Sequence, residues 1–230
     1  MINVRPFASL GHADHGWLNA RHHFSFAGYH EPERMGWGAI RVWNDDTIAA
    51  RSGFPPHPHR DMEIVTYVRS GAITHQDSMG NKGRTAAGDV QVMSAGSGVV
   101  HSEFNLEDED TTLFQIWIQT DRPGVDPGWG MMPFPKDARE GSFQLLASGQ
   151  PEDGALAIHA DARILGATIR AGACVEYPAD PSRHLYLVPS AAVRVNGVTA
   201  GARDGVAITG EQLIRIEADS DAELVLVDAR

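Results

Sequence analysis

The sequence predicts an all-β protein with two β domains in tandem, each of them a barrel or a sandwich. Short strand-like runs recur along the chain and are bounded by residues typical of turns. No window keeps the apolar period of a helix. The 230 residues include 24 Gly and 13 Pro, a content that indicates many turns and short strands.

Five strand-like runs occupy the first half, which is rich in β-branched and aromatic residues. They cover residues 38–43, 63–68, 72–75, 89–93 and 112–118. Polar or Gly-containing segments follow most of them. We expect the first run to end at Asn44-Asp45-Asp46, the second at Ser70-Gly71, and the third at a loop over residues 77–83.

A segment rich in Pro and Gly, residues 121–141, divides the halves, and we interpret it as a linker or crossover. Strand-like runs then resume at residues 143–146, 167–170, 184–188, 192–195, 212–216 and 223–227. Asn196-Gly197 stands between two of them and predicts a β-hairpin. We therefore predict an N-terminal domain over residues 1–128 and a C-terminal domain over residues 129–230.

Charge and composition exclude several classes of function. The net charge is −11, so direct binding to nucleic acid is not expected, because that requires clusters of Lys and Arg. The single Cys174 excludes an intramolecular disulfide and a Cys-rich zinc site. No signal peptide and no run of about 20 apolar residues is found, so we predict a cytoplasmic protein without a membrane segment.

Two short motifs predict a metal site in the N-terminal domain. His57-x-His59 and His101-x-Glu103 each stand beside a strand-like run. Residues i and i+2 of a strand point to the same face, so each motif can direct two donor atoms at one point. Chance alone gives an H-x-H in about every second chain of this composition, so the second motif carries much of the argument.

Imidazole and carboxylate ligands suit a divalent transition metal. We expect one such ion per chain, iron(II) first, with zinc, nickel, copper, manganese or cobalt as alternatives. Four protein ligands would leave two positions of an octahedron open to substrate, water or O₂. The C-terminal domain has only His159 and His184 and neither motif, so we expect no metal there.

Other residues leave alternatives open. Glu63 would share a strand face with His57 and His59, and is the main rival of Glu103 as a ligand. His75, at the end of a strand-like run, could contact the site, although a pocket or packing role is the simpler interpretation. For His12, His15, His22 and His23 we expect no part in the metal site.

Longer strings resemble the pirin family, whose members have two cupin domains, which are jelly-roll-like β-barrels. Gly53 to Gly71 is similar to the first cupin motif. Gly88 and Gly98 to Asn105 are similar to the second, with Ser94 in place of the usual Pro. The family resemblance is dense over residues 1–120, and it rests on strings such as HHFSFAGYHEP, HPHRDMEIVTYVRSG, HQDSMGNKG and GDVQVMSAGSGVVHSE.

This resemblance implies that the metal ligands are His57, His59, His101 and Glu103. It also implies a metal-dependent quercetin 2,3-dioxygenase, which opens the flavonol ring with O₂ and releases CO. The small aromatic substrate and O₂ would then be the partners. We assign the general base to Glu103, acting from the metal. Phe24, Phe26, Phe54 and Trp117 could line the substrate, although core packing is the simpler role for each.

An alternative follows from the eukaryotic members of the family, which resemble iron-dependent transcriptional co-regulators. In that case the protein would be a non-catalytic iron or redox sensor that binds a protein partner. A third alternative is a metal-dependent cupin that acts on another small enol or on a sugar. Metal analysis and an O₂-uptake assay with quercetin would discriminate among them.

Overall fold

The computed structural model describes the backbone of residues 1–230 and every side chain except that of Pro151. Its regular elements are β-strands and four short 3-10 helices, which confirms the predicted all-β class. None of the helices described is long and apolar enough to cross a membrane. Contacts divide the chain into two units, described separately below.

The N-terminal unit comprises Gly11–Phe134 and Leu156–Ala160, and the C-terminal unit comprises Met1–Leu10, Pro135–Ala155 and Asp161–Arg230. The predicted domain limits, 1–128 and 129–230, stay a prediction, because packing contacts do not show which segment folds alone. His159 lies in the short segment that packs with the N-terminal unit.

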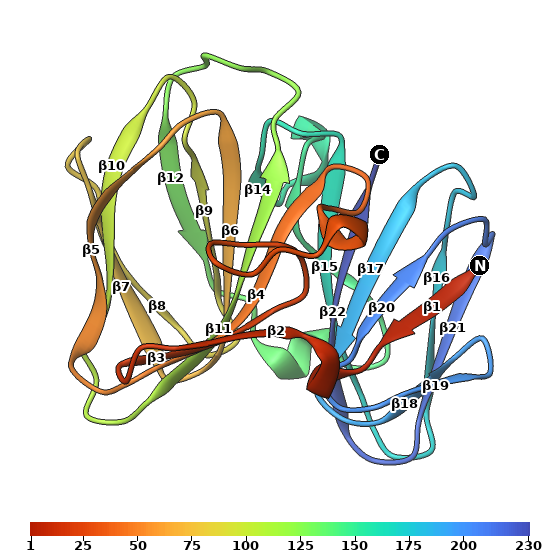
Figure 1. Cartoon of the computed structure of the whole chain (residues 1–230). Coiled ribbons are helices and arrows are strands. Elements are labelled where there is room, and N and C mark those ends of the chain that lie inside the picture. Colours follow the sequence, from red (N-terminus) through yellow and green to blue (C-terminus); the bar gives the residue numbers. More distant parts are fainter. The chain divides into compact units, whose positions relative to one another are not determined.

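Two antiparallel sheets form the N-terminal unit. The larger has the order β12-β9-β6-β11-β4-β3-β2, and the smaller has the order β5-β10-β7-β8. Figure 1 shows the two sheets on opposite sides of one interior. The strands are β2 (Gly11–Asp14), β3 (Leu18–His22), β4 (Ile40–Ile48), β5 (Ser52–His59), β6 (Met62–Ser70), β7 (Ala72–Asp77), β8 (Lys82–Ala86), β9 (Val90–Ser94), β10 (Val99–Asn105), β11 (Thr111–Gln119) and β12 (Gly128–Met132).

The centre of the larger sheet follows from its apolar runs. β6 and β11 pair along their whole length, and both are almost fully buried. Continuous apolar runs of this kind are typical of strands that are covered on both faces. Leu113 and Ile73 lie in one core cluster between the sheets, and Ile64 and Met93 lie in another.

The predicted end of the first run at Asn44-Asp45-Asp46 is wrong. β4 continues through these residues to Ile48, and all three polar side chains are buried. Two of the three have partners inside the fold: His22 hydrogen-bonds Asn44 at 2.8 Å, and Arg69 pairs with Asp45. A run of Asn and Asp resembles a turn in sequence, because these partners are far away along the chain.

The interpretation of residues 121–141 as a linker or crossover is partly wrong. Gly128–Met132 forms β12, which pairs with β9 at the end of the larger sheet. Composition suggested a loop because Gly is depleted in strands. Gly weakens a strand without excluding it, and the strand forms here at the end of the sheet.

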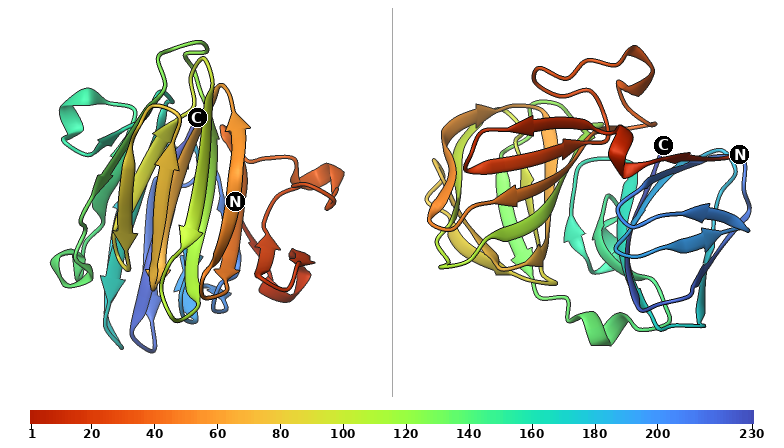
Figure 2. Two further views of the ribbon diagram at one scale, coloured as in Figure 1. Left: turned by 90° about the vertical axis from the view of Figure 1, so that its left-hand side faces the viewer. Right: turned by 60° about the horizontal axis from the view of Figure 1, so that its bottom comes forward.

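The C-terminal unit also has two antiparallel sheets. In one, the strands β1, β20, β17, β22, β15 and β13 are neighbours in this order, and the other has the order β16-β21-β18-β19. The right-hand view of Figure 2 shows these strands around an interior of their own. Their bounds are β1 (Ile2–Arg5), β13 (Gln144–Ser148), β15 (Ala162–Ile169), β16 (Cys174–Pro178), β17 (His184–Pro189), β18 (Val193–Val195), β19 (Val198–Ala200), β20 (Gly205–Ile208), β21 (Leu213–Ala218) and β22 (Ala222–Ala229).

Two local features of this unit bear on the sequence predictions. The hairpin at Asn196-Gly197 is confirmed, since it joins β18 to β19 and both residues have positive φ, 46° and 82°. That geometry is the two-residue turn that Asn-Gly favours. The other feature was not predicted: the first strand of the chain, β1, pairs with β20 in the C-terminal unit.

Candidate metal centre

Strands β5 and β10 bring the two predicted motifs together. In this antiparallel pair His57 lies opposite His101, and His59 lies opposite Val99. A shift of register between His101 and Glu103 places Glu103 opposite Phe54. Such an irregularity redirects side chains locally, and irregularities of this kind are frequent beside active sites.

Three imidazoles converge in the interior beside β5. The ring centroids of His57 and His101 are 4.5 Å apart, and those of His59 and His101 are 4.9 Å apart. The donor atoms of His57, His59 and His101 all lie within 4.8 Å of one another. The structure therefore brings together the three predicted His ligands.

The spacing of two donor atoms fits a single ion. The Nε2 atoms of His57 and His101 are 3.1 Å apart. Two nitrogens at right angles, each about 2.1 Å from one ion, would be about 3.0 Å apart. The donor set and this distance both fit a divalent transition metal, so a bound ion would be held by the three imidazoles.

Two of the imidazoles, those of His59 and His101, can bind a metal without losing a proton. Burial, with the neighbouring His57, lowers the pKa of His59 to about 4. Burial, with the neighbouring histidines, lowers the pKa of His101 to about 3. Both rings are therefore neutral near pH 7, which is the state that ligates a metal.

Glu103 lies beside His101, on the side of His75. Its carboxylate belongs to a second, overlapping group with His75 and His101, whose donor atoms also lie within 4.8 Å of one another. It is not a member of the group formed by His57, His59 and His101. His101 is thus the residue that the two groups share, and the place of Glu103 as a ligand stays a prediction.

Two amides and a hydroxyl hold the Glu103 carboxylate. Gln91 donates to Oε1 and Gln115 donates to Oε2, each at 2.6 Å, and the Thr66 hydroxyl donates to Oε1 at 3.3 Å. The amides are themselves oriented, because Thr85 donates to the carbonyl oxygen of Gln91 and Trp117 donates to that of Gln115. Glu103 therefore has a fixed orientation.

Glu103 also lacks a positive partner. Its side chain is buried, and no Arg or Lys among the described residues pairs with it. Burial raises the pKa of Glu103 to about 7, although its three hydrogen bonds act in the opposite direction. A bound cation beside this carboxylate would compensate for its burial.

Sequence reasoning missed the polar side chains that surround Glu103. Thr66, Gln91 and Gln115 lie on β6, β9 and β11, within runs that were assigned as core strands. In the sequence, each of these three could have been recognised as a polar residue inside an apolar run. Asp46 was also missed: it is fully buried, and burial raises its pKa well above the usual range, with Asp45 and Glu103 acting in the same direction.

His75 contacts the site from β7. Its Nδ1 is 3.4 Å from Nδ1 of His101, and its Nε2 is 3.0 Å from a carboxylate oxygen of Asp77. The ring also stacks on Trp129 with centroids 5.0 Å apart. Burial lowers the pKa of His75, although Asp77 acts to raise it, so the ring is neutral and can donate a hydrogen bond to that carboxylate.

Glu63, the rival ligand, points elsewhere. It is buried beside Ser94, whose hydroxyl donates to its Oε2 at 2.6 Å, and it belongs to neither group of metal-binding donors. Burial raises its pKa. Among the described residues, the groups also exclude His12, His15, His22, His23, His159 and His184.

A groove borders the site at His59. It has a volume of about 400 Å³, and its lining includes Pro58, His59, Gly98 and Val99. Because His59 forms part of its wall, a small molecule in the groove would lie beside the imidazoles.

Aromatic rings flank the three imidazoles. Trp117 packs edge-on against His59 at 4.9 Å and against Phe26 at 5.4 Å. Phe54 lies 6.2 Å from His57 and packs on Trp17. Of the four aromatic residues considered from sequence, Phe24 alone is fully buried in the core.

Comparisons with known proteins agree with this geometry. The family model described as Pirin matches residues 3–118, and the model described as Quercetinase C-terminal cupin domain matches residues 145–229. The chain is 62% identical to "Pirin-like protein" of Caulobacter vibrioides over 100% of both chains. It is 46% identical to "Quercetin 2,3-dioxygenase" of Escherichia coli K12, over 99% of this chain and 98% of the relative.

A solved structure is similar over the whole chain. The bacterial pirin YhhW from Escherichia coli, in complex with nickel(II), superposes with a TM-score of 0.93 at 42% sequence identity. The match covers 100% of this chain and 99% of that chain.

Proposed function

The chain belongs to the pirin family, and on that premise we propose that it is a metal-dependent dioxygenase of the quercetin 2,3-dioxygenase type. The observation that carries the proposal is the convergence of His57, His59 and His101 beside an accessible groove. The names of its relatives support the reaction type, and the donor set supports the metal.

We assign iron(II) as the resident ion, held by His57, His59, His101 and Glu103, one ion per chain. A relative binds nickel(II) in a crystal structure, so nickel is the first alternative. Zinc, copper, manganese and cobalt suit the same ligands. When bound, the ion would supply Lewis-acid stabilisation of the oxygen left by the flavonol 3-hydroxyl.

The protein's own groups bind the substrate and move its proton. A flavonol that reaches His59 from the groove would meet Trp117, which packs edge-on against that imidazole and can pack on a flat aromatic ligand. The Glu103 carboxylate takes the 3-hydroxyl proton, because it is the buried carboxylate beside His101. Buried walls around Glu103 exclude water from this transfer.

The overall reaction consumes one O₂ for each flavonol. Both oxygen atoms enter the flavonol, the C ring opens, and one carbon leaves as CO. The products are therefore CO and an ester of two phenolic acids. No other oxidant is required.

The experiment is O₂ uptake with quercetin, with CO measured in the same vessel. Protein loaded separately with iron(II) or nickel(II) should consume one O₂ and release one CO per quercetin. A metal-free sample is the control. Stoichiometric metal without O₂ uptake would overturn the proposal and would favour the regulatory alternative.

A further inference from the structure

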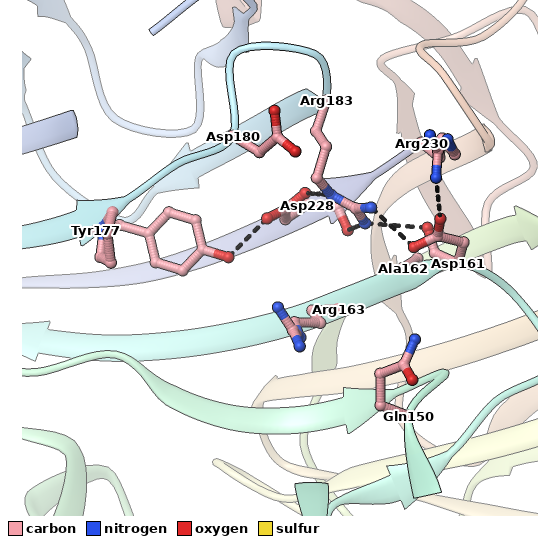
Figure 3. A pocket seen from close by; sticks show the side chains of 10 residues that line it. Gln150, Asp161, Ala162, Arg163, Tyr177, Asp180, Arg183, Asp228 and Arg230 are labelled. Carbon is pink, nitrogen blue, oxygen red and sulfur yellow. Dashed lines mark hydrogen bonds and ion pairs between the residues drawn. The ribbon is translucent and has the colours of Figure 1, made fainter. Parts of the chain in front are cut away.

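The C-terminal unit has a polar cavity of about 390 Å³ at one end of its strands. Its lining includes Arg163 on β15, Tyr177 on β16, Asp228 on β22 and Arg183 before β17 (Figure 3). This volume is within the range of small-molecule sites, at its lower end. All of the lining residues belong to one unit.

One wall of the cavity is a fixed ion-pair network. Arg183 donates to Asp228 through Nε and to Asp161 through Nη1, and the Tyr177 hydroxyl donates to Asp228 at 2.6 Å. Asp228 and Tyr177 are buried. Their partners compensate for their charge and polarity, so this wall is preorganised and has little capacity left for a cation.

The same residues do not form a metal site. Among the described residues, no group of three or more metal-binding donors includes Asp161, Asp180 or Asp228. Arg183 lies between Asp161 and Asp228 and bonds to both of them. A divalent cation would have to displace its guanidinium.

The opposite wall offers hydrogen-bond donors that have no partner among the described residues. Arg163 bonds to Asp153 through Nε only, at 3.3 Å, so both of its terminal nitrogens are left for a ligand. In Figure 3 the Arg163 guanidinium lies between the Tyr177–Asp228 wall and Gln150, and no dashed line reaches it. The Gln150 amide is likewise without a described partner.

A hydrogen-bond acceptor is also left at the rim. Asp180 receives the Ser182 backbone N–H and hydroxyl on Oδ1, which leaves Oδ2 to accept from a ligand. The lining therefore presents a planar guanidinium fork, an amide and one carboxylate oxygen. Its three Arg and three Asp side chains give no net charge, which disfavours a multiply charged anion.

We propose that this cavity binds a small hydroxylated monocarboxylate. Its carboxylate pairs with the two terminal nitrogens of Arg163, since a guanidinium matches a carboxylate in a bidentate way. Its hydroxyl groups donate to Asp180 and exchange hydrogen bonds with Gln150 and Tyr177. The proposal concerns the C-terminal unit and does not depend on the function proposed for the metal centre.

The test is calorimetric titration of the metal-loaded protein at low ionic strength with D-gluconate, a monocarboxylate with several hydroxyl groups. Three matched probes separate the chemistry: sorbitol lacks the carboxylate, hexanoate lacks the hydroxyl groups, and inorganic phosphate is a different anion. We expect gluconate to bind with a Kd below about 1 mM, and each other probe at least tenfold more weakly.

Variants locate the site. Arg163→Gln should weaken gluconate binding at least tenfold, and Arg194→Gln, which removes an exposed arginine outside the cavity, should leave it unchanged. Binding should persist in His101→Ala, which excludes chelation at the metal centre. Absence of gluconate binding, equal binding of sorbitol or phosphate, or full binding by Arg163→Gln would each overturn the proposal.

Discussion

Nε2 of His57 and Nε2 of His101 lie 3.1 Å apart, and the two residues are direct partners in the β5–β10 ladder. Residues that face each other in an antiparallel pair have closely spaced side chains on one face. The ladder thus fixes the separation of two proposed metal donors that are far apart in sequence.

The first prediction concerns metal content. The purified protein should bind one transition metal ion per chain, measured by elemental analysis. His101 belongs to both groups of candidate ligands. His101→Ala should therefore weaken metal binding more than about 100-fold, a larger loss than is usual when a residue that only hydrogen-bonds a ligand is removed. His159→Ala is the control and should bind normally. Two ions per chain would contradict the assignment.

The second prediction separates metal binding from turnover. Glu103→Gln keeps the shape of the side chain but cannot accept a proton near neutral pH. The three imidazoles should retain much of the metal, while quercetin cleavage per bound metal falls about 10²–10⁴-fold, the scale of general-base catalysis. If activity per metal is near wild type while Glu63→Gln is inactive, the base is Glu63.

The third prediction is a pH dependence of metal affinity. Without metal, burial holds the pKa of Glu103 at about 7, so an ion that binds its carboxylate must displace a proton below that pH. The apparent Kd should therefore rise about tenfold per unit as pH falls from 7 towards 5. His59 and His101, with pKa values of about 4 and 3, add nothing in that range.

Glu103→Gln is the matched control for this pH dependence, because glutamine has no proton to lose. The contribution of Glu103 to the slope between pH 5 and 7 should disappear in the variant. An unchanged slope would show that Glu103 does not bind the ion. Titrations with nickel(II), which is stable to air, can measure both proteins.

The fourth prediction is a pH dependence of stability that follows from the raised pKa of Glu103. The pKa of Glu103 is 4.5 in its reference state and about 7 in the folded protein, so the folded state binds the proton more tightly. The metal-free protein should therefore lose stability as pH rises from 4.5 through 7. Urea unfolding at several pH values measures this loss, and Glu103→Gln should reduce it. A wild-type protein whose loss equals that of the variant would contradict the assignment.

The fifth prediction tests the close approach of β5 to β10. A Cβ added at Gly53 would lie 2.3 Å from the backbone oxygen of Glu103 and 2.5 Å from the Cα of Phe104. Gly53→Ala must push the strands apart, so it should weaken metal binding and destabilise the protein by about 1–3 kcal/mol. Gly128→Ala on β12, with nothing within 4 Å, should do neither. Metal titration and urea unfolding measure both effects, and equal behaviour of the two variants would contradict the argument.

The sequence alone determined the class of the fold and the types of candidate metal ligand. Apolar runs separated by turn residues indicated strands, because a buried strand requires apolar side chains wherever it lies. The H-x-H motif and His101 gave the three imidazoles that converge, because the i,i+2 repeat of a strand is a local property, whereas the place of Glu103 as a ligand stays a prediction. Asn196-Gly197 specified its hairpin for the same reason.

Only the tertiary structure decided how these residues meet. The register of β5 against β10 placed His57 opposite His101, and no local pattern carries that information. The folded chain also buried Asp46 inside β4 and brought Gln91 and Gln115 to Glu103 from separate strands. Gln91 and Gln115 are not recognisable as interior positions in sequence, because the carboxylate to which they donate comes from another strand.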